Sequence, residues 1–314
     1  MDNHTTISLV IPTYNEEHNI VELYQSLKKA LISIPYNFEY IFVDDGSSDS
    51  TLEIIRQLAL RDQNVYYIEL SRNFGHQSAL KAGLDHAQGA CVISMDCDLQ
   101  HPPEVVVELI KKWEEGYEVV YTKRKDNKKS PRLKRYTSSF FYMLLNYLSD
   151  LKLEKGTADF RLMSRNVLNA FSHLKESEIF IRGLVKWAGF KQIAVEYEPN
   201  ERFSGQSKYS FSKMISFALK GLTSFSTKPL KLVVYVGLIL FLFSLLLIPY
   251  ALISYLIGSA VSGWTSVMIS IFFFGSLQLL MMGIIGLYIS KLVIQSKYRP
   301  LYLIRETNYR NSTR

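Results

Sequence analysis

Two aspartates one residue apart are the side chains best suited to chemistry in this sequence. Residues 92–95, Val-Ile-Ser-Met, predict a short buried strand, and Asp96 and Asp98 follow it directly. Residues i and i+2 of an extended chain point the same way, so the two carboxylates can converge on one ion. Carboxylate oxygens suit Mg²⁺ or Mn²⁺, which leave positions open for the oxygens of a diphosphate. The pattern therefore predicts a divalent-metal site, with a solvated turn as the alternative for such a triplet.

Other polar clusters follow apolar segments in the same way. Strands are predicted at residues 7–12, 38–43, 65–70, 92–95 and 118–122, and helices at about 18–33, 50–61, 76–87 and 104–113. This alternation predicts an α/β fold, a mostly parallel Rossmann-like sheet with helices on both faces. The clusters are Tyr14-Asn15-Glu16, Asp44-Asp45, Arg72-Asn73, the two aspartates and Lys123-Arg124. Because ligands bind at the carboxyl ends of such strands, we expect the clusters to line one cleft. No Gly-x-Gly-x-x-Gly follows the first strand, which disfavours a dinucleotide redox cofactor.

The last third of the chain predicts a membrane hairpin. Residues 232–258 and 267–290 carry no charged side chain, and each exceeds the length of about 20 residues that crosses a bilayer. The short connection between them lacks Lys and Arg, whereas both outer flanks are basic. By the positive-inside rule, both ends of the hairpin are cytoplasmic. With no signal peptide expected, the catalytic part is predicted to lie on the cytoplasmic face of the inner membrane.

The excess of basic residues is uneven along the chain. The formal net charge is +7, and eight Lys or Arg fall within residues 123–135. We interpret these residues as contacting lipid headgroups or an anionic substrate, and we expect no nucleic acid. Residues 211–225 predict an amphipathic helix in the membrane interface, and residues 134–148 another on the core or the membrane surface. Cys91 and Cys97 have no metal-site spacing and are expected to be reduced thiols.

Six ordered motifs resemble those of a known family. They are Val-Ile-Pro-Thr-Tyr-Asn-Glu at 10–16, Val-Asp-Asp-Gly-Ser at 43–47, Asn-Phe-Gly-His-Gln at 73–77, Asp-Cys-Asp-Leu-Gln at 96–100, Asp-Phe-Arg-Leu-Met at 159–163 and Arg-Phe-Ser-Gly-Gln-Ser-Lys-Tyr at 202–209. The set resembles family 2 glycosyltransferases of the GT-A fold, of the polyisoprenyl-phosphate type that includes dolichyl-phosphate mannose synthase and bactoprenol glucosyltransferases. One departure is Cys97, where this family usually has Ala; only a small side chain is needed there.

The resemblance implies a role for each matching residue. Binding of the donor nucleotide is implied for Pro12, Tyr14, Glu16, Val43, Asp45, Asp96, Cys97 and Arg124. Metal binding is implied for Asp96, Asp98 and Gln100, with Mg²⁺ or Mn²⁺ as the cofactor. Catalytic roles are implied for Asp98, Asp159, Arg202 and Lys208, where Arg124, Arg202 and Lys208 contact phosphates and Asp159 lies near the acceptor. Alternatives are a solvated basic loop for Arg202 and Lys208, and a helix N-cap or an ion pair with Arg161 for Asp159.

The implied reaction is the inverting transfer of a sugar from a nucleotide-sugar, UDP-glucose being the first candidate, to undecaprenyl phosphate. The expected domains are a catalytic domain at 1–209, an interfacial helix at 210–229, a two-span hairpin at 230–292 and a cytosolic basic tail at 293–314. A homo-oligomer, such as a tetramer, is expected. Two alternatives are a processive polysaccharide synthase, whose Gln-x-x-Arg-Trp motif is missing here, and a non-catalytic membrane scaffold with a decayed transferase domain.

Overall fold

The computed structural model describes most of the chain. It describes residues 5–125, 156–174, 176, 180–200, 226–257 and 263–309. The described residues fall into two compact units, of which the first holds the segments before residue 200 and those after residue 298, and the second holds residues 226–298. The predicted amphipathic segments 134–148 and 211–225 lie outside the described residues, as do Arg202 and Lys208.

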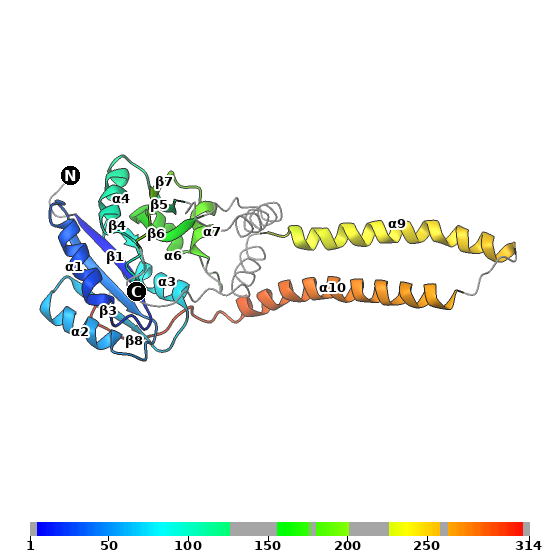
Figure 1. Ribbon diagram of the computed structural model, residues 1–314, viewed down its shortest axis with the longest axis horizontal. Helices are drawn as coiled ribbons and strands as arrows, with labels where there is room; N and C mark the ends of the chain where they lie inside the picture. Colours follow the sequence, from blue (N-terminus) through cyan, green and yellow to red (C-terminus); the bar gives the residue numbers. More distant parts are fainter. Residues whose placement is uncertain are drawn as a thin grey trace. The chain divides into compact units, whose positions relative to one another are not determined.

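An eight-stranded sheet organises the first unit (Figure 1). Its strands are β1 (Thr6–Thr13), β2 (Asn37–Asp44), β3 (Val65–Leu70), β4 (Cys91–Ser94), β5 (Val119–Arg124), β6 (Thr157–Ser164), β7 (Gln192–Tyr197) and β8 (Ile304–Thr307). They are ordered β7-β5-β6-β4-β1-β2-β3-β8. The pairs among β1 to β4 and the pair β5–β7 are parallel, whereas β6 and β8 run antiparallel to their neighbours. The prediction of a mostly parallel sheet is confirmed.

Helices pack on both faces of this sheet. Leu9 and Ile11 of β1 belong to a buried cluster with α1 (Ile20–Leu31), α2 (Thr51–Arg61) and α4 (Glu104–Glu114). The alternate residue, Val10, faces α3 (His76–His86), because a Cβ added to Gly83 of that helix would lie 2.2 Å from Val10 Cγ1. The helices α6 (Arg165–Ser172) and α7 (Ile181–Trp187) contact β6.

The strand order changes direction beside β1. The chain runs from β1 outward through β2 to β3, and then returns to form β4 on the opposite side of β1. At such a switch point the loops that leave the carboxyl ends of the two strands diverge and open a crevice. The residues after β1 and β4, including Asp96 and Asp98, therefore flank a natural binding crevice.

The last strand joins the sheet from the far end of the chain. β8 pairs with the edge strand β3, Arg305 Nη1 donates to Glu69 Oε1 at 3.0 Å, and the Tyr309 hydroxyl donates to Glu39 Oε2 at 2.9 Å. Tyr309 is itself buried. The segment predicted as a basic tail thus carries a strand that covers the β3 edge, where unpaired backbone groups would otherwise be exposed.

Two long helices form the second unit. They are α9 (Lys228–Leu256) and α10 (Trp264–Ser296), which lie side by side (Figure 1). Within the described residues, one segment, Phe273–Ser296 of α10, meets the length and composition expected of a membrane span. Both predicted apolar stretches are therefore helical, and one of them qualifies as a span by this measure.

Candidate functional site

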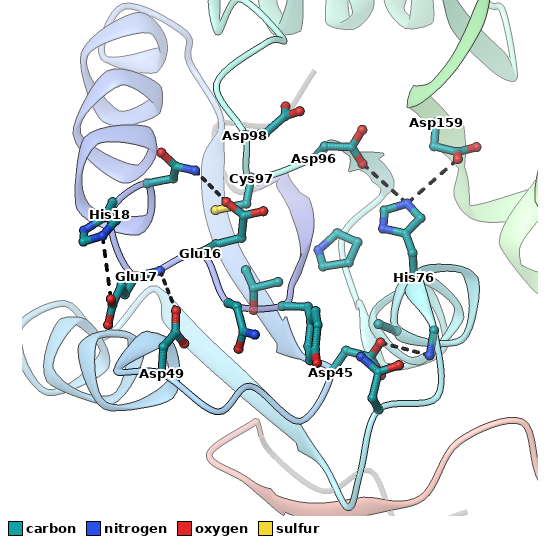
Figure 2. A pocket seen from close by; sticks show the side chains of 18 of the residues that line it. Glu16, Glu17, His18, Asp45, Asp49, His76, Asp96, Cys97, Asp98 and Asp159 are labelled. Carbon is teal, nitrogen blue, oxygen red and sulfur yellow. Dashed lines mark hydrogen bonds and ion pairs between the residues drawn. The ribbon is translucent and has the colours of Figure 1, made fainter. Parts of the chain in front are cut away.

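A cavity of about 560 Å³ lies at the carboxyl ends of β1, β2 and β4. Figure 2 shows side chains that line it; the lining residues come from the loops after β1, β2, β3 and β4, from α3, from β6 and from α7. Eight of the expected site residues line it: Pro12, Tyr14, Glu16, Asp45, Asp96, Cys97, Asp98 and Asp159. The residues following different strands therefore meet at one place, as the pattern of polar clusters predicted.

Three of the expected residues do not line the cavity. Val43 is fully buried under α3 and its carbonyl accepts a hydrogen bond from Thr13 Oγ1 at 3.1 Å, so it supports the β1–β2 edge. Gln100 donates its backbone N–H to Asp98 Oδ1 at 3.2 Å. Arg124, at the end of β5, donates from Nε to the Tyr197 hydroxyl at 3.0 Å.

The loops after β1 and β2 hold each other through polar contacts. The Asn15 N–H donates to Ser47 Oγ at 3.0 Å, and the Ser48 N–H donates to Asn15 Oδ1 at 2.8 Å. Asn15 has a φ of 54°, a left-handed conformation that Asn tolerates better than most residues. These contacts fix the backbone beside Tyr14, whose side chain is 40% exposed and available to a flat ligand.

Asp45 fixes the next loop of the cavity. Its carboxylate accepts hydrogen bonds from the Phe74 N–H at 2.7 Å and the Gly75 N–H at 2.9 Å. Burial raises the pKa of Asp45, and the two backbone N–H groups oppose that rise. A carboxylate has about four acceptor positions, so Asp45 can hold this loop and still accept a donor group from a ligand.

Gly46 allows this loop to approach closely, and a matched pair of substitutions tests its role. Gly46 has a φ of 72°, and an added Cβ would lie 2.7 Å from the backbone carbon of Arg72. Gly116 has a similar φ of 88° with nothing within 4 Å. Gly116→Ala should cost about 1–2 kcal/mol of backbone strain, and Gly46→Ala about 1–3 kcal/mol more from overpacking. Thermal unfolding and binding of a fluorescent UDP analogue measure both effects, and equal losses in the two variants would contradict the close approach.

Asp96 is oriented by two histidines. The fully buried His101 donates from Nε2 to Asp96 Oδ2 at 3.1 Å, and its Nδ1 accepts from the Tyr197 hydroxyl at 2.9 Å. His76 Nε2 lies 3.4 Å from Asp96 Oδ1 (Figure 2). Burial opposes ionisation of Asp96, but the hydrogen bond from His101 and the nearby His76 hold its pKa below the ordinary value. Arg124 thus connects to Asp96 through Tyr197 and His101.

The donor set at Asp96 and Asp98 fits a hard divalent cation. Asp96 Oδ1 is buried and makes no hydrogen bond, although His76 Nε2 lies 3.4 Å away, and a cation would satisfy this oxygen. Asp98 lines the same cavity. In the part of the chain that the structure describes, no three His, Cys, Asp or Glu side chains are arranged to hold a metal. Mg²⁺ is usually held by one or two carboxylates together with substrate phosphates, so two aspartates suffice when a diphosphate is bound.

Asp159 lies on the other side of His76 from Asp96, with its Oδ2 3.9 Å from His76 Nε2 (Figure 2), and is held by basic side chains. Arg182 donates from Nε to Asp159 Oδ1 and from Nη2 to Oδ2, both at 2.8 Å. Arg161 Nη2 donates to Oδ1 at 3.2 Å, and Gln77 Nε2 donates to Oδ2 at 3.1 Å. Burial alone would raise the pKa of Asp159, but the charges of Arg182 and Arg161 hold it well below its ordinary value.

Three residues of the site were not predicted from the sequence: His76, His101 and Arg182. His76 falls inside the Asn-Phe-Gly-His-Gln motif, and His101 directly follows Gln100. Their positions in or beside these motifs could therefore have identified both as site residues. Arg182 belongs to no motif. Only the packing of α7 against β6 brings it to Asp159.

The two cysteines take no part in polar chemistry here. Both are buried free thiols, as predicted. Burial raises the pKa of Cys97, which keeps it protonated and makes it a small apolar wall of the cavity.

Comparison with known proteins agrees with the motifs. The profile described as "Glycosyl transferase family 2" matches residues 8–171. The uncharacterized glycosyltransferase YkcC of Bacillus subtilis is 43% identical over 98% of this chain and 95% of its own length. The bactoprenol glucosyl transferase of Shigella phage SfV is 43% identical over 95% of this chain and 98% of its own length.

Solved structures are more distant. Glucosyl-3-phosphoglycerate synthase from Mycobacterium tuberculosis, crystallised with Mn²⁺, UDP and phosphoglyceric acid, is 21% identical, covering 70% of this chain and 76% of its own chain with a TM-score of 0.45. A likeness of that degree says nothing of ligands. The profile match and the near full-length relatives show that the chain belongs to glycosyl transferase family 2.

Proposed function

We propose that this protein transfers glucose from UDP-glucose to a polyprenyl phosphate, undecaprenyl phosphate being the expected acceptor. The supporting observation is the cavity in which Asp45, Asp96 and Asp98 meet at the switch point of the sheet. Relatives of nearly the same length are named bactoprenol glucosyl transferase, which supports glucose and a polyprenyl acceptor.

The donor nucleotide is assigned to the β1 and β2 side of the cavity. Pro12, Tyr14 and Glu16 follow β1, and Asp45 follows β2. Tyr14 offers an exposed ring to the base or ribose, and Asp45 offers carboxylate oxygens to a ring N–H or a ribose hydroxyl. The diphosphate then points toward Asp96 and Asp98.

Asp96 and Asp98 are assigned to a Mg²⁺ or Mn²⁺ ion on the donor diphosphate. Such an ion offsets the negative charge that develops on the departing nucleoside diphosphate. His101 keeps Asp96 in place through its Nε2–H, and the Tyr197 hydroxyl sets the tautomer of that histidine. Gln100, the third expected ligand, lies next to this pair in the chain.

The acceptor needs orientation more than it needs a base. A phosphate monoester has a second pKa near 6, so its oxygen is already anionic at neutral pH. The protein's contribution is therefore to hold that oxygen in line with the sugar carbon and to offset its charge. Arg202 and Lys208 are assigned to this task by their motif. In-line attack inverts the anomeric carbon, giving a β-linked product from an α-linked donor.

The order of the sheet supports two membrane crossings. β1 to β7 precede α9 in the chain, β8 follows α10, and all of these strands belong to one sheet. A chain that leaves a domain and returns to it crosses a membrane an even number of times. Because α10 contains a candidate span, α9 supplies the second crossing, and its residues 232–256 carry no charged side chain. The basic flanks support a cytoplasmic location for the sheet.

Single-cysteine labelling tests this topology. Cys91 and Cys97 are buried and should give little background. Ser262→Cys, between α9 and α10, should react with a membrane-impermeant maleimide added to intact cells. The matched variant Arg299→Cys, after α10, should react only after the cells are opened. Labelling of both variants from the outside would contradict the two-span hairpin.

The reaction is tested with purified protein, undecaprenyl phosphate, Mg²⁺ and a panel of labelled UDP- and GDP-sugars. We expect label from UDP-glucose to enter the organic phase, with one sugar per lipid. Product of growing length would instead support a processive synthase. Nucleotide binding without transfer from any donor would support the non-catalytic scaffold.

A further inference from the structure

Asp159 accepts as many hydrogen bonds as a carboxylate can. Its two oxygens receive Nε and Nη2 of Arg182, Nη2 of Arg161 and Nε2 of Gln77, at 2.8 to 3.2 Å. An ionised carboxylate offers about four acceptor positions. No acceptor position is then left with which Asp159 could take a proton from a substrate, and the lipid phosphate acceptor has no need of a base.

Arg182 is the most exposed side chain in the cluster that it forms with Asp159 and Arg161. The side chains of Asp159 and Arg161 are 6% and 3% exposed, whereas that of Arg182 is 30% exposed. Arg182 is also a member of the cluster that lines the cavity, where it presents a permanently charged guanidinium. The fork to Asp159 uses the Nε–H and an Nη2–H of the Arg182 guanidinium.

The cavity has few cations for an anionic substrate. Seven carboxylates line it, from Glu16, Glu17, Asp45, Asp49, Asp96, Asp98 and Asp159. Arg182 is the only Lys or Arg among the cavity-lining residues that the structure describes. A permanently charged guanidinium matches phosphate oxygens in geometry and charge.

Gln77 gives the same cluster a second anchor. Its Oε1 accepts from the Ile181 N–H at 3.3 Å, while its Nε2 donates to Asp159. The start of α7, which carries Arg182, is thereby tied to the start of α3, which carries His76. The direction of Arg182 is therefore fixed by residues on three different elements.

Building on the glycosyl transfer reaction of the previous section, we propose that Arg182 binds a substrate phosphate and that Asp159 acts through it as a positioning residue. The phosphate belongs to the donor diphosphate or to the lipid acceptor. Asp159 holds the guanidinium by its Nε–Nη2 edge and prevents it from swinging out of the cavity. Arg161 also pairs with Asp159, so this carboxylate is shared between two guanidiniums.

A double-mutant cycle in kcat/KM tests this coupling. Arg182→Gln should lower kcat/KM about 10- to 100-fold, as expected for a lost charge-assisted contact, and Arg182→Lys should recover part of the loss. Asp159→Asn should cause a similar loss alone, but less than about a threefold further loss in the Arg182→Gln background. Lys186→Gln, one turn further along α7, is the matched control and should match the wild type.

A general-base role for Asp159 gives a different result. In that case Asp159→Asn would lower kcat/KM by a further factor of about 100 or more in the Arg182→Gln background. That outcome would overturn the proposal. Thermal unfolding of each variant in detergent checks that the losses do not come from unfolding, and Arg182→Gln alone still tests the phosphate contact if Asp159→Asn does not fold.

Binding measurements identify the phosphate and do not depend on turnover. Titration with UDP and with inorganic pyrophosphate, each with Mg²⁺, should show at least about tenfold weaker binding to Arg182→Gln if the donor diphosphate is the ligand. An unchanged affinity for both, with a raised KM for undecaprenyl phosphate, would assign Arg182 to the acceptor. Wild-type values for all three would overturn the proposal. Pyrophosphate binding that depends on Arg182 would stand even if glucose transfer were not observed.

Discussion

Replacing Asp98 by Asn is expected to abolish glucosyl transfer while leaving the protein folded. Asp98 is one of two carboxylates assigned to the metal on the donor diphosphate, and an amide oxygen is a much weaker ligand for a hard cation. Loss of that charge stabilisation, worth several kcal/mol, lowers kcat by about 1000-fold. The side chain is half-buried and accepts the backbone N–H of Gln100, a hydrogen bond that the amide oxygen of Asn can also accept.

The control for this variant is Glu104→Gln. Glu104 lies at the exposed start of α4 and does not line the cavity. Both variants should unfold at the wild-type temperature, whereas only Asp98→Asn should lose Mg²⁺-dependent binding of UDP-glucose. Wild-type turnover by Asp98→Asn would remove Asp98 from the metal site.

Ending the chain after Tyr302 is expected to unfold the catalytic unit. This truncation removes β8, Arg305 and Tyr309, so Glu69 loses one of its two cationic partners and Glu39 loses the Tyr309 hydroxyl. Loss of a buried aromatic side chain alone costs about 3–5 kcal/mol. Against a total stability of about 5–15 kcal/mol, the further loss of the β3–β8 pairing leaves little margin.

A second truncation serves as the control. Ending the chain after Tyr309 keeps β8 and its contacts and should retain the melting temperature and activity of the full chain. Equal stability of the two truncated proteins would show that residues 303–309 are dispensable for the fold. The exposed β3 edge should also make the shorter protein prone to aggregate, which light scattering measures.

The central strands could be predicted because apolar side chains project from both faces of each strand. β1 to β4 are buried on both faces, so each reads as a short apolar run that ends in polar residues. That pattern also located Asp45, which follows β2 directly, and Asp96 and Asp98, which lie in the loop after β4.

The strands β6, β7 and β8 were not predicted, and each of them contains charged side chains. β6 contains Asp159 and Arg161, which are both buried and form an ion pair with each other. β8 reads Ile-Arg-Glu-Thr and pairs through charges on neighbouring elements, such as Glu69 and Arg56. In β6 the buried residues Ala158, Phe160 and Leu162 alternate with charged ones. The charged residues of β6 and β8 have partners far away in the sequence, such as Arg182 for Asp159 and Glu69 for Arg305.

The same distinction holds for the site residues. Asp96 and Asp98 are close in sequence and in space, so their spacing predicted their chemistry. Arg182 reaches the cavity only through contacts between α7, α3 and β6. No motif or spacing in the single sequence predicts the contact between Arg182 and Asp159.

One measurement tests the central proposal most directly: incubation of purified protein with UDP-[¹⁴C]glucose, Mg²⁺ and undecaprenyl phosphate, followed by extraction of the lipid. We expect label in the organic phase with undecaprenyl phosphate, none with undecaprenol, and none with Asp98→Asn. Label transferred to undecaprenol, or equal label with Asp98→Asn, would contradict a metal-assisted transfer to a lipid phosphate.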